Sequence, residues 1–277
     1  VMKTADLNLL EQKIAEAIEY ISCNMESSCR AALEKAREGE ENPTARFALD
    51  VMCDNADIAA KNGFPVCQDT GMAVVFLYVG RELKLDGDIY KAVNDGVRRG
   101  YKMLRKSVLD PVTRVNTGDN TPAVIHTQIV EGEKIRVEIM LKGFGSENMS
   151  KVYMLNPAQG LEEAKRLIID SVAVAGSNPC PPVIVGVGLG GTLEKACELS
   201  KHALFRKLGS SNPDPELDNL EKYLLGEINK LGVGAQGFGG NTTALGVFIE
   251  KYPTHISSLP VAVNMLCHCS RAASFEI

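Results

Sequence analysis

The chain has 277 residues, of which 45% are hydrophobic and 23% charged, and its 30 basic and 35 acidic side chains give a net charge of −5. This length and composition are typical of a globular protein with one large domain or two modest ones. The acidic balance, the absence of tryptophan and the aromatic content of 5% argue against nucleic acid or an anionic membrane as a partner.

Two further features of the sequence indicate where the protein works. No apolar signal segment precedes the first charged helix, and no apolar run has the length of a membrane span. We therefore expect a cytoplasmic protein, in which the eight cysteines are mostly thiols rather than disulfides. Cysteines inside predicted helices are expected to pack as small hydrophobic residues. These are Cys23, Cys29, Cys53 and Cys197.

The first third of the chain is predicted to be helical. Between residues 5 and 61, apolar side chains recur at helical spacing with Glu and Lys between them. Asn42-Pro43-Thr44 interrupts this pattern and separates two helices. The second and third predicted helices cover residues 27–37 and 45–61, and the first, which precedes them, carries Cys23.

Strands and helices are mixed in the rest of the chain. Two strand-like runs, 123–130 and 134–141, are joined by Glu131-Gly132-Glu133, which predicts a hairpin. The other predicted strands cover 72–79, 183–187, 244–250 and 259–266, and the predicted helices cover 90–106, 160–175, 192–208 and 215–231. The predicted fold class is therefore mixed α/β (α+β), with a helical N-terminal third. We expect one domain over residues 1–277, with a division into two lobes near residue 155 as an alternative.

The loop from residue 62 to residue 71 carries more chemistry than a surface turn requires. Cys67, Gln68, Asp69 and Thr70 place a thiol, an amide, a carboxylate and a hydroxyl in consecutive positions. We interpret Cys67 as a ligand of a metal or cluster, and the next three residues as facing a small substrate. The alternative is that Asp69 only caps the turn.

Two further cysteines stand out by their surroundings. Cys180 lies between prolines, which restrict the backbone and suit a ligand that is held in position. Cys267 stands at the end of an apolar run. These thiols are far apart in the sequence, so their spacing alone identifies no metal site.

Two glycine-rich stretches need a separate interpretation. Residues 186–191 follow a predicted strand and precede a predicted helix, which is the order found in dinucleotide-binding sites. The glycine spacing differs from that fingerprint, so a nucleotide-dependent oxidoreductase is disfavoured, and a helix N-terminus that stabilises an anion is favoured. Residues 232–243 have the composition of a loop built for backbone contacts.

Six stretches, distributed in order along nearly the whole chain, carry a family resemblance. They are Gly63–Gly71, Asn116–Ala123, Lys142–Asn148, Asn178–Pro182, Gly188–Gly191 and Leu259–His268. In these motifs the sequence resembles the iron–sulfur-dependent hydro-lyases, namely class I fumarase and L-tartrate dehydratase, in their alpha subunit or N-terminal region.

The resemblance implies a [4Fe-4S] cluster held by Cys67, Cys180 and Cys267. Cys269 is the competing third ligand, and Cys267 is favoured because its place after the apolar run matches the family. Three thiolates leave one iron open, which can act as a Lewis acid on a substrate hydroxyl and carboxylate. The residues implied to contact a small dicarboxylate are Gln68, Asp69, Arg105, Gly145 and His255. Among them, Asp69 is the candidate for proton transfer, and the planar guanidinium of Arg105 suits a carboxylate. His255 resembles a residue that the family contributes across a subunit interface, with an ordinary surface histidine as the alternative.

The activity implied by the resemblance is fumarate hydratase, the reversible hydration of fumarate to L-malate. L-tartrate dehydratase is the alternative, and a non-catalytic cluster- or metal-binding module is the alternative of another class. In this family a second region supplies the catalytic base, and the chain ends where that region would begin. We therefore expect a beta subunit as partner, an alpha–alpha dimer within a heterotetramer, and no activity of the chain alone.

Overall fold

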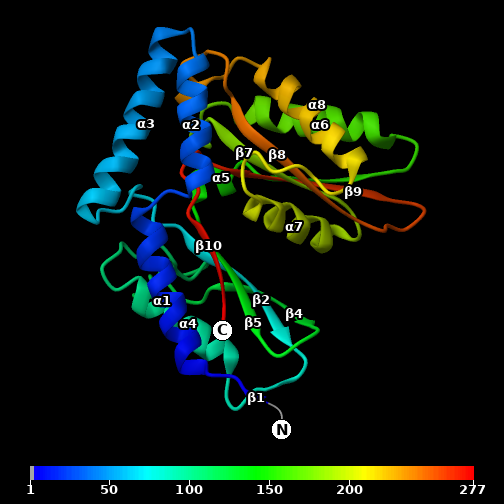
Figure 1. Cartoon of the computed structure of the whole chain (residues 1–277). Helices are drawn as coiled ribbons and strands as arrows, with labels where there is room; N and C mark the ends of the chain where they lie inside the picture. Colours follow the sequence, from blue (N-terminus) through cyan, green and yellow to red (C-terminus); the bar gives the residue numbers. More distant parts are fainter. Residues whose placement is uncertain (1–2) are drawn as a thin grey trace. The chain divides into compact units, whose positions relative to one another are not determined.

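The computed structural model describes residues 3–277 as two compact units, each built from segments that are distant in the sequence (Figure 1). Unit 1 contains the residues up to Glu26, residues 56–144 and residues 271–277. Unit 2 contains residues 27–55 and 145–270. Among the described residues, no helix is long and apolar enough to cross a membrane.

Unit 1 is a four-stranded sheet covered on one face by helices α1 and α4. The strand order is β10-β5-β2-β4, in which β2 and β4 are parallel and the other pairs are antiparallel. Alternate residues of β2, including Val75 and Leu77, pack with both helices in one apolar core. The elements of this unit are β1 (Lys3–Thr4), α1 (Leu7–Cys23), β2 (Met72–Gly80), β3 (Leu83–Lys84), α4 (Ile89–Gly100), β4 (Val124–Val130), β5 (Ile135–Lys142) and β10 (Ala272–Glu276).

Two glycines of α4 allow it to pack closely on α1. A Cβ at Gly96 would lie 2.8 Å from the Cβ of Ile14, and a Cβ at Gly100 would lie 2.7 Å from the Cβ of Ile18. Real side chains do not approach so closely, so this helix contact requires glycine at both positions. The helix ends at Gly100, and the predicted helix over 90–106 is therefore too long. The chain turns at Tyr101, whose side chain is completely buried.

The predicted hairpin between residues 123–130 and 134–141 is wrong. Both segments are strands, β4 and β5, but β2 lies between them and pairs with each. The connection passes around the end of β2, where the Gly80 N–H donates to the Lys134 carbonyl at 2.9 Å. A short polar turn between two strand-like runs gives no sign that an earlier strand inserts between them.

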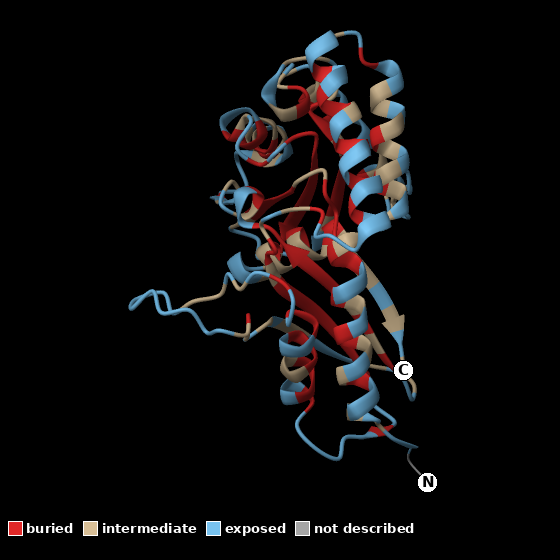
Figure 2. Cartoon of the chain, turned by 90° about the vertical axis from the view of Figure 1, so that its left-hand side faces the viewer, coloured by how far each residue is buried: buried red, intermediate tan, exposed pale blue. Residues whose placement is uncertain are grey.

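Unit 2 is a four-stranded sheet with helices on both faces. The strand order is β6-β9-β7-β8, in which β7 and β8 are parallel and the other pairs are antiparallel. Helices α6 and α8 cover one face and α7 covers the other (Figure 1), and the central strands are buried (Figure 2). The elements are α2 (Ser27–Gly39), α3 (Pro43–Asn62, which ends in unit 1), α5 (Phe144–Glu147, whose first residue belongs to unit 1), β6 (Lys151–Leu155), α6 (Gly160–Ala175), β7 (Val183–Gly190), α7 (Leu193–His202), η1 (Ala203–Phe205), α8 (Pro215–Asn229), η2 (Ala235–Gly237), β8 (Ala244–Tyr252) and β9 (Leu259–Leu266).

The glycines of β7 have a packing role. A Cβ at Gly186 would lie 2.1 Å from the Ser200 carbonyl oxygen, and a Cβ at Gly188 would lie 2.0 Å from the Ala196 carbonyl oxygen. Helix α7 therefore contacts the strand backbone directly, which any larger residue at these positions prevents. This close packing accounts for two of the glycines in the stretch 186–191 without a ligand.

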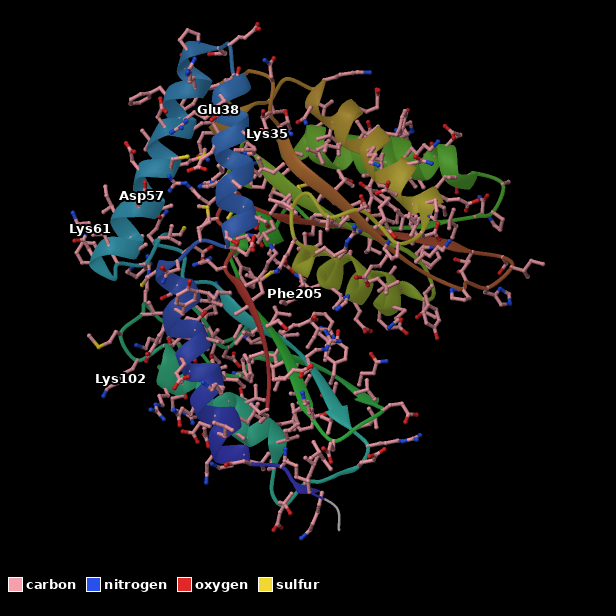
Figure 3. All side chains as sticks on the ribbon, in the orientation of Figure 1. Lys35, Glu38, Asp57, Lys61, Lys102 and Phe205 are labelled. Carbon is pink, nitrogen blue, oxygen red and sulfur yellow. The ribbon has the colours of Figure 1, made fainter. Side chains whose placement is uncertain are left out.

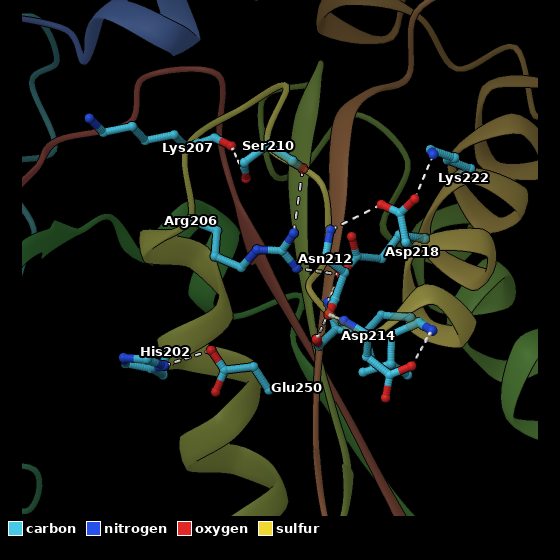
Figure 4. Close-up of polar contacts among 12 residues, drawn as sticks. His202, Arg206, Lys207, Ser210, Asn212, Asp214, Asp218, Lys222 and Glu250 are labelled. Carbon is cyan, nitrogen blue, oxygen red and sulfur yellow. Dashed lines mark hydrogen bonds and ion pairs between the residues drawn. The ribbon is translucent and has the colours of Figure 1, made fainter.

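The outer edge of β8 is covered by side chains rather than by another strand. Glu221 of α8 is buried and accepts hydrogen bonds from the Ile249 N–H (2.8 Å) and from Asn212 Nδ2 (2.7 Å). Arg206 forms an ion pair with the same carboxylate, so the buried charge is compensated. Figure 4 shows Arg206 and Asn212 in this network. Asn212 Nδ2 also donates to the Ile249 carbonyl at 3.1 Å, so at Ile249 the polar groups of this edge are occupied and do not bind a further strand.

The predicted fold class, mixed α/β with a helical first third, is confirmed. The two-residue strands β1 and β3 and the longer strands β6 and β10 were not predicted from the sequence. The latter two belong to the four-stranded sheets. Each lies at the edge of its sheet, pairs on one side and is largely exposed or half-buried. Such strands need no continuous apolar run, so their sequences give little periodic signal.

Candidate functional site

The loop Cys67–Gly71 is held in unit 1 through its backbone carbonyls. Tyr101 donates from its hydroxyl to the carbonyls of Thr70 (2.8 Å) and Gly71 (3.2 Å). Asn120, which is completely buried, donates from Nδ2 to the Gly71 carbonyl (3.1 Å). Burial raises the pKa of Tyr101 far above its usual value, so the hydroxyl keeps its proton and remains a donor.

The same loop is bonded to the segment that carries Arg105. Thr70 is buried and donates from Oγ1 to the Arg105 carbonyl at 2.6 Å. Arg105 and Gln68 are exposed, and Cys67 is half-buried with its thiol 3.8 Å from the Gln68 amide oxygen. Unit 1 therefore carries four of the predicted site residues, Cys67, Gln68, Asp69 and Arg105, on two loops that are joined by a hydrogen bond.

Asp69 has a structural role in the turn. Its Oδ1 accepts a hydrogen bond from the Gly71 N–H (2.9 Å), and its Oδ2 accepts one from the Phe144 N–H (2.7 Å) at the start of α5. A Cβ at Gly143 would lie 3.1 Å from Asp69 Oδ2, so the chain passes close to the carboxylate. The turn-capping alternative for Asp69 is thus realised, and the carboxylate is fixed in position. Its predicted role in proton transfer stays a prediction.

Arg271 is a residue of this region that the sequence did not single out. Its side chain is 2% exposed, and its Nη1 donates to the Asp69 carbonyl at 2.6 Å. Its own carbonyl accepts from the Leu141 N–H (2.9 Å) just before β10 begins. Among the described residues, its Nε has no hydrogen-bond partner. The available signal was an arginine directly before a short strand, but that strand was itself not predicted.

Unit 2 brings Cys180 and Cys267 to the same end of its sheet. Cys180 precedes β7 and Cys267 follows β9, and these antiparallel strands pair Ile184 with Leu266. His268 donates from Nδ1 to the Cys180 carbonyl at 3.0 Å. Because a carbonyl only accepts, the ring proton is on Nδ1. Burial lowers the pKa of His268, which favours the neutral ring.

The cysteines of unit 2 differ in accessibility. Cys29, Cys53 and Cys269 are between 1% and 3% exposed, whereas Cys267 is half-buried and Cys180 is exposed. The predicted packing role of the first two is therefore confirmed. Cys269, the competing third ligand, is the less accessible of the two neighbouring thiols.

Gly145 and His255 lie in exposed parts of unit 2. Gly145 belongs to the single turn α5, where a Cβ would lie at ordinary contact distance, 3.5 Å, from the Asn178 carbonyl. His255 is in the loop between β8 and β9, and the Ser257 N–H donates to its Nδ1 at 3.2 Å. The neutral ring therefore carries its proton on Nε2. Their roles in substrate binding stay predictions.

The second glycine-rich stretch contacts the Cys180 turn. Gln236 donates from its N–H (2.8 Å) and from Nε2 (3.1 Å) to the Pro181 carbonyl. A Cβ at Gly237, where φ is +80°, would lie 2.5 Å from the Ser177 Cβ. The sequence predicted a loop built for backbone contacts but not the partner, because the two segments are distant in the chain.

The donor atoms of these residues suit an iron–sulfur cluster, which requires thiolate ligands. Cys180 and Cys267 offer two accessible thiols at one end of a sheet, and Cys67 offers a third in unit 1. Within residues 3–277, no group of three or more His, Cys, Asp or Glu side chains is placed to hold a metal ion. The chemistry and accessibility of the thiols, rather than a preformed ligand group, therefore support the cluster.

Comparison with known proteins decides the family. A family model described as fumarate hydratase (fumerase) matches residues 11–276. The chain belongs to this family. A Methanocaldococcus jannaschii protein, provisionally named L(+)-tartrate dehydratase subunit alpha, is 38% identical over 270 residues, which cover 94% of both chains. The L(+)-tartrate dehydratase subunit alpha of Escherichia coli strain UTI89 is 30% identical over 281 residues, which cover 99% of this chain and 93% of the relative.

The resemblance predicted from the six motifs is thereby confirmed. Fumarate hydratases and tartrate dehydratases both add or remove water at a carbon–carbon double bond, so the family is one of hydro-lyases. The match covers both units, and it includes every predicted site residue from Cys67 to Cys267.

Proposed function

We propose that this chain is the alpha subunit of an enzyme that removes water from a small hydroxy dicarboxylate, with L-tartrate as the favoured substrate. The observation that carries this proposal is the near full-length similarity to two relatives named L(+)-tartrate dehydratase subunit alpha, at 38% and 30% identity. The sequence motifs alone favoured fumarate hydratase. The names of these relatives favour tartrate instead.

Fumarate and L-malate are the second candidate pair, because the family model is described as fumarate hydratase. Tartrate differs from malate by one hydroxyl group, at the carbon that loses its proton. A site that hydrogen-bonds this hydroxyl discriminates strongly against a substrate that lacks it, since polar groups of the site are then left unpaired. The ratio of kcat/KM for L-tartrate and L-malate therefore separates the two candidates.

The proposal includes a [4Fe-4S] cluster with Cys67, Cys180 and Cys267 as its ligands. When bound, the cluster would supply a Lewis-acidic iron that polarises the substrate hydroxyl and carboxylate. The accessibility of these thiols supports the assignment, because the neighbouring Cys269 is buried.

The other predicted residues are proposed to bind and orient the substrate. The Arg105 guanidinium binds a substrate carboxylate through two parallel hydrogen bonds, and the Gln68 amide bonds a second polar group. The missing side chain at Gly145 lets the backbone approach the substrate. Asp69 keeps lone pairs beyond those used by two N–H groups, so it can accept a proton or orient a hydroxyl. His255 donates a hydrogen bond from Nε2 to the substrate that is bound in the site of a neighbouring copy of this chain.

The proposed partner is a beta subunit, because the relatives are named alpha subunits. We propose that the beta subunit supplies the catalytic base and that the chain alone is inactive. The assembly is an alpha–alpha dimer within a heterotetramer, and it works in the cytoplasm.

The first experiment compares substrates. The chain is prepared anaerobically with iron and sulfide, alone and with a beta-type subunit, and assayed with L-tartrate, L-malate and fumarate. We expect turnover of L-tartrate to oxaloacetate, only with both subunits, and an EPR signal that changes when tartrate is added. Faster turnover of malate or fumarate would establish the second candidate, and full activity of the isolated chain would refute the two-subunit proposal.

The second experiment tests the ligand assignment. Cys267→Ser is expected to lose bound iron, whereas Cys269→Ser is expected to retain it if the variant folds. The opposite pattern, read from iron content per chain, would exchange the roles of the two cysteines.

The third experiment tests the carboxylate site. Arg105→Lys keeps the charge but loses the planar fork, and we expect kcat/KM to fall about 10- to 100-fold, which corresponds to about 1.5–3 kcal/mol for a charged hydrogen bond. Lys102→Met is the matched control, since Lys102 is an exposed basic residue of the same turn (Figure 3). Equal losses in both variants would contradict a specific role of Arg105.

A further inference from the structure

The backbone of Cys180 has a conformation that its neighbours must enforce. Its φ is +57°, in the left-handed region that is unfavourable for a residue with a side chain. The flanking prolines remove N–H donors from this segment, so it has few hydrogen bonds of its own. The Cys180 N–H itself donates to the Ser177 carbonyl at 3.1 Å. Such a strained turn persists only where surrounding structure fixes it.

Gln236 contacts this turn directly after Cys180. The Pro181 carbonyl accepts two hydrogen bonds from Gln236, one from the backbone N–H at 2.8 Å and one from Nε2 at 3.1 Å. Gln236 is itself left-handed, with φ of +53°. This conformation aims both donors of one residue at one carbonyl, and the adjoining Gly237 lets the loop lie against Ser177.

The loop that carries Gln236 is anchored at its other end. Glu40 is buried, and its Oε2 accepts a hydrogen bond from the Asn241 N–H at 2.8 Å. A Cβ at Gly240 would lie 2.5 Å from the same oxygen, so the carboxylate fills the space that glycine leaves. The loop is thus fixed in unit 2 independently of its contact with the Cys180 turn.

We propose that Gln236 is a positioning residue for Cys180. By holding the Pro181 carbonyl with two donors, it keeps Cys180 in the left-handed conformation in which its thiol is exposed. The inference rests on the proposed function, in that the positioned thiol is the cluster ligand. His268 holds the preceding carbonyl, that of Cys180, through its Nδ1.

The test uses Gln236→Met, which retains the length of the side chain and the backbone N–H but removes the amide donor. In the iron-depleted chain, the Cys180 and Gln236 amides are expected to exchange hydrogen about fivefold faster, as loss of one ordinary hydrogen bond predicts. Amides of β7 should exchange at the wild-type rate. Gln12→Met is the control, because Gln12 is exposed on α1, where its amide donates to the Glu16 carboxylate.

The protein with its cluster bound provides a second measurement, the properties of the cluster itself, which would not change if Gln236 had a purely structural role. Gln236→Met is expected to change the EPR line shape and to lose the cluster absorbance in air about fivefold faster, with the Tm of the iron-depleted chain lowered by only about 2–4 °C, as loss of one hydrogen bond predicts. Unchanged exchange at Cys180, or equal acceleration in Gln12→Met, would overturn the inference. Faster exchange with an unchanged cluster signal would also overturn it, because Gln236 would then order the loop without positioning a ligand. If the wild type binds no iron, the proposed function fails, while faster exchange confined to the Cys180 turn still supports the inference.

Discussion

Asn120 is the residue whose replacement tests most directly how the Cys67 loop is held. It is completely buried, and its Oδ1 accepts hydrogen bonds from the N–H groups of Ser107 (2.7 Å) and Val108 (3.1 Å). Its Nδ2 donates to the Gly71 carbonyl at 3.1 Å. One side chain thus joins the loop around Gly71 to the segment after Arg105.

The expected effect of Asn120→Ala follows from these contacts. Each lost hydrogen bond contributes about 1 kcal/mol net, so the three together contribute about 3 kcal/mol. Asn120 also has φ of +65°, where alanine is strained by about 1 kcal/mol more. We expect Asn120→Ala to lower the free energy of unfolding of unit 1 by about 4 kcal/mol, and Asn120→Gly, which relieves the strain, by about 3 kcal/mol.

The assay is hydrogen exchange in increasing urea, followed by mass spectrometry. Peptides from β2 report the opening of unit 1, and peptides from β7 report unit 2 as an internal reference. Asn116→Ala is the matched control in the same loop, because Asn116 is exposed and water can replace its bonds to Lys106 and Gly118. The reasoning is refuted if Asn120→Ala weakens β2 no more than Asn116→Ala does, or weakens β2 and β7 equally.

Three further predictions concern packing and ionisation. Gly188→Ala places a Cβ 2.0 Å from the Ala196 carbonyl oxygen, so we expect hydrogen exchange of the β7 amides to show that their free energy of opening falls by at least about 2 kcal/mol. The control is Gly226→Ala, whose Cβ meets no atom within 4 Å and which should stabilise α8 by about 0.5–1 kcal/mol. Burial of Asp119 raises its pKa, but hydrogen bonds from its neighbours outweigh this and lower the pKa to about 2. Its folded pKa therefore lies below its unfolded value, so its stabilisation is present above about pH 4 and lost towards pH 2, and melting curves of wild type and Asp119→Asn should converge over that interval. Tyr101 should stay protonated, so the absorbance at 295 nm, which reports ionised tyrosine, should rise with pH in the same way in wild type and Tyr101→Phe up to about pH 11. A difference between the two curves would contradict the burial of Tyr101.

Several parts of the candidate site could be found from the sequence because their signals are local. The consecutive polar groups of the Cys67 loop and the prolines around Cys180 mark unusual segments without any knowledge of the fold. The buried cysteines of α2 and α3 were also correctly predicted to pack, because their helices show a clear apolar period. Six such local motifs carried the family resemblance, which the match of the family model confirms.

Other parts depend on which segments meet in three dimensions. The contacts of Arg271 with Asp69 and of Gln236 with Pro181 join residues far apart in the chain, and no periodic pattern encodes them. The insertion of β2 between β4 and β5 has the same character, because strand-like runs reveal their own conformation but not their neighbours.

The sequence by itself therefore determined the helical first third and most of the strands, and it supplied the candidate residues for cluster and substrate binding, whose roles stay predictions. Only the tertiary structure decided that Gly186 and Gly188 serve helix packing and that the Asp69 carboxylate caps the start of α5. The physical reason is that local conformation depends on a residue and its near neighbours, whereas close approach and hydrogen-bond partnership depend on the whole packed unit.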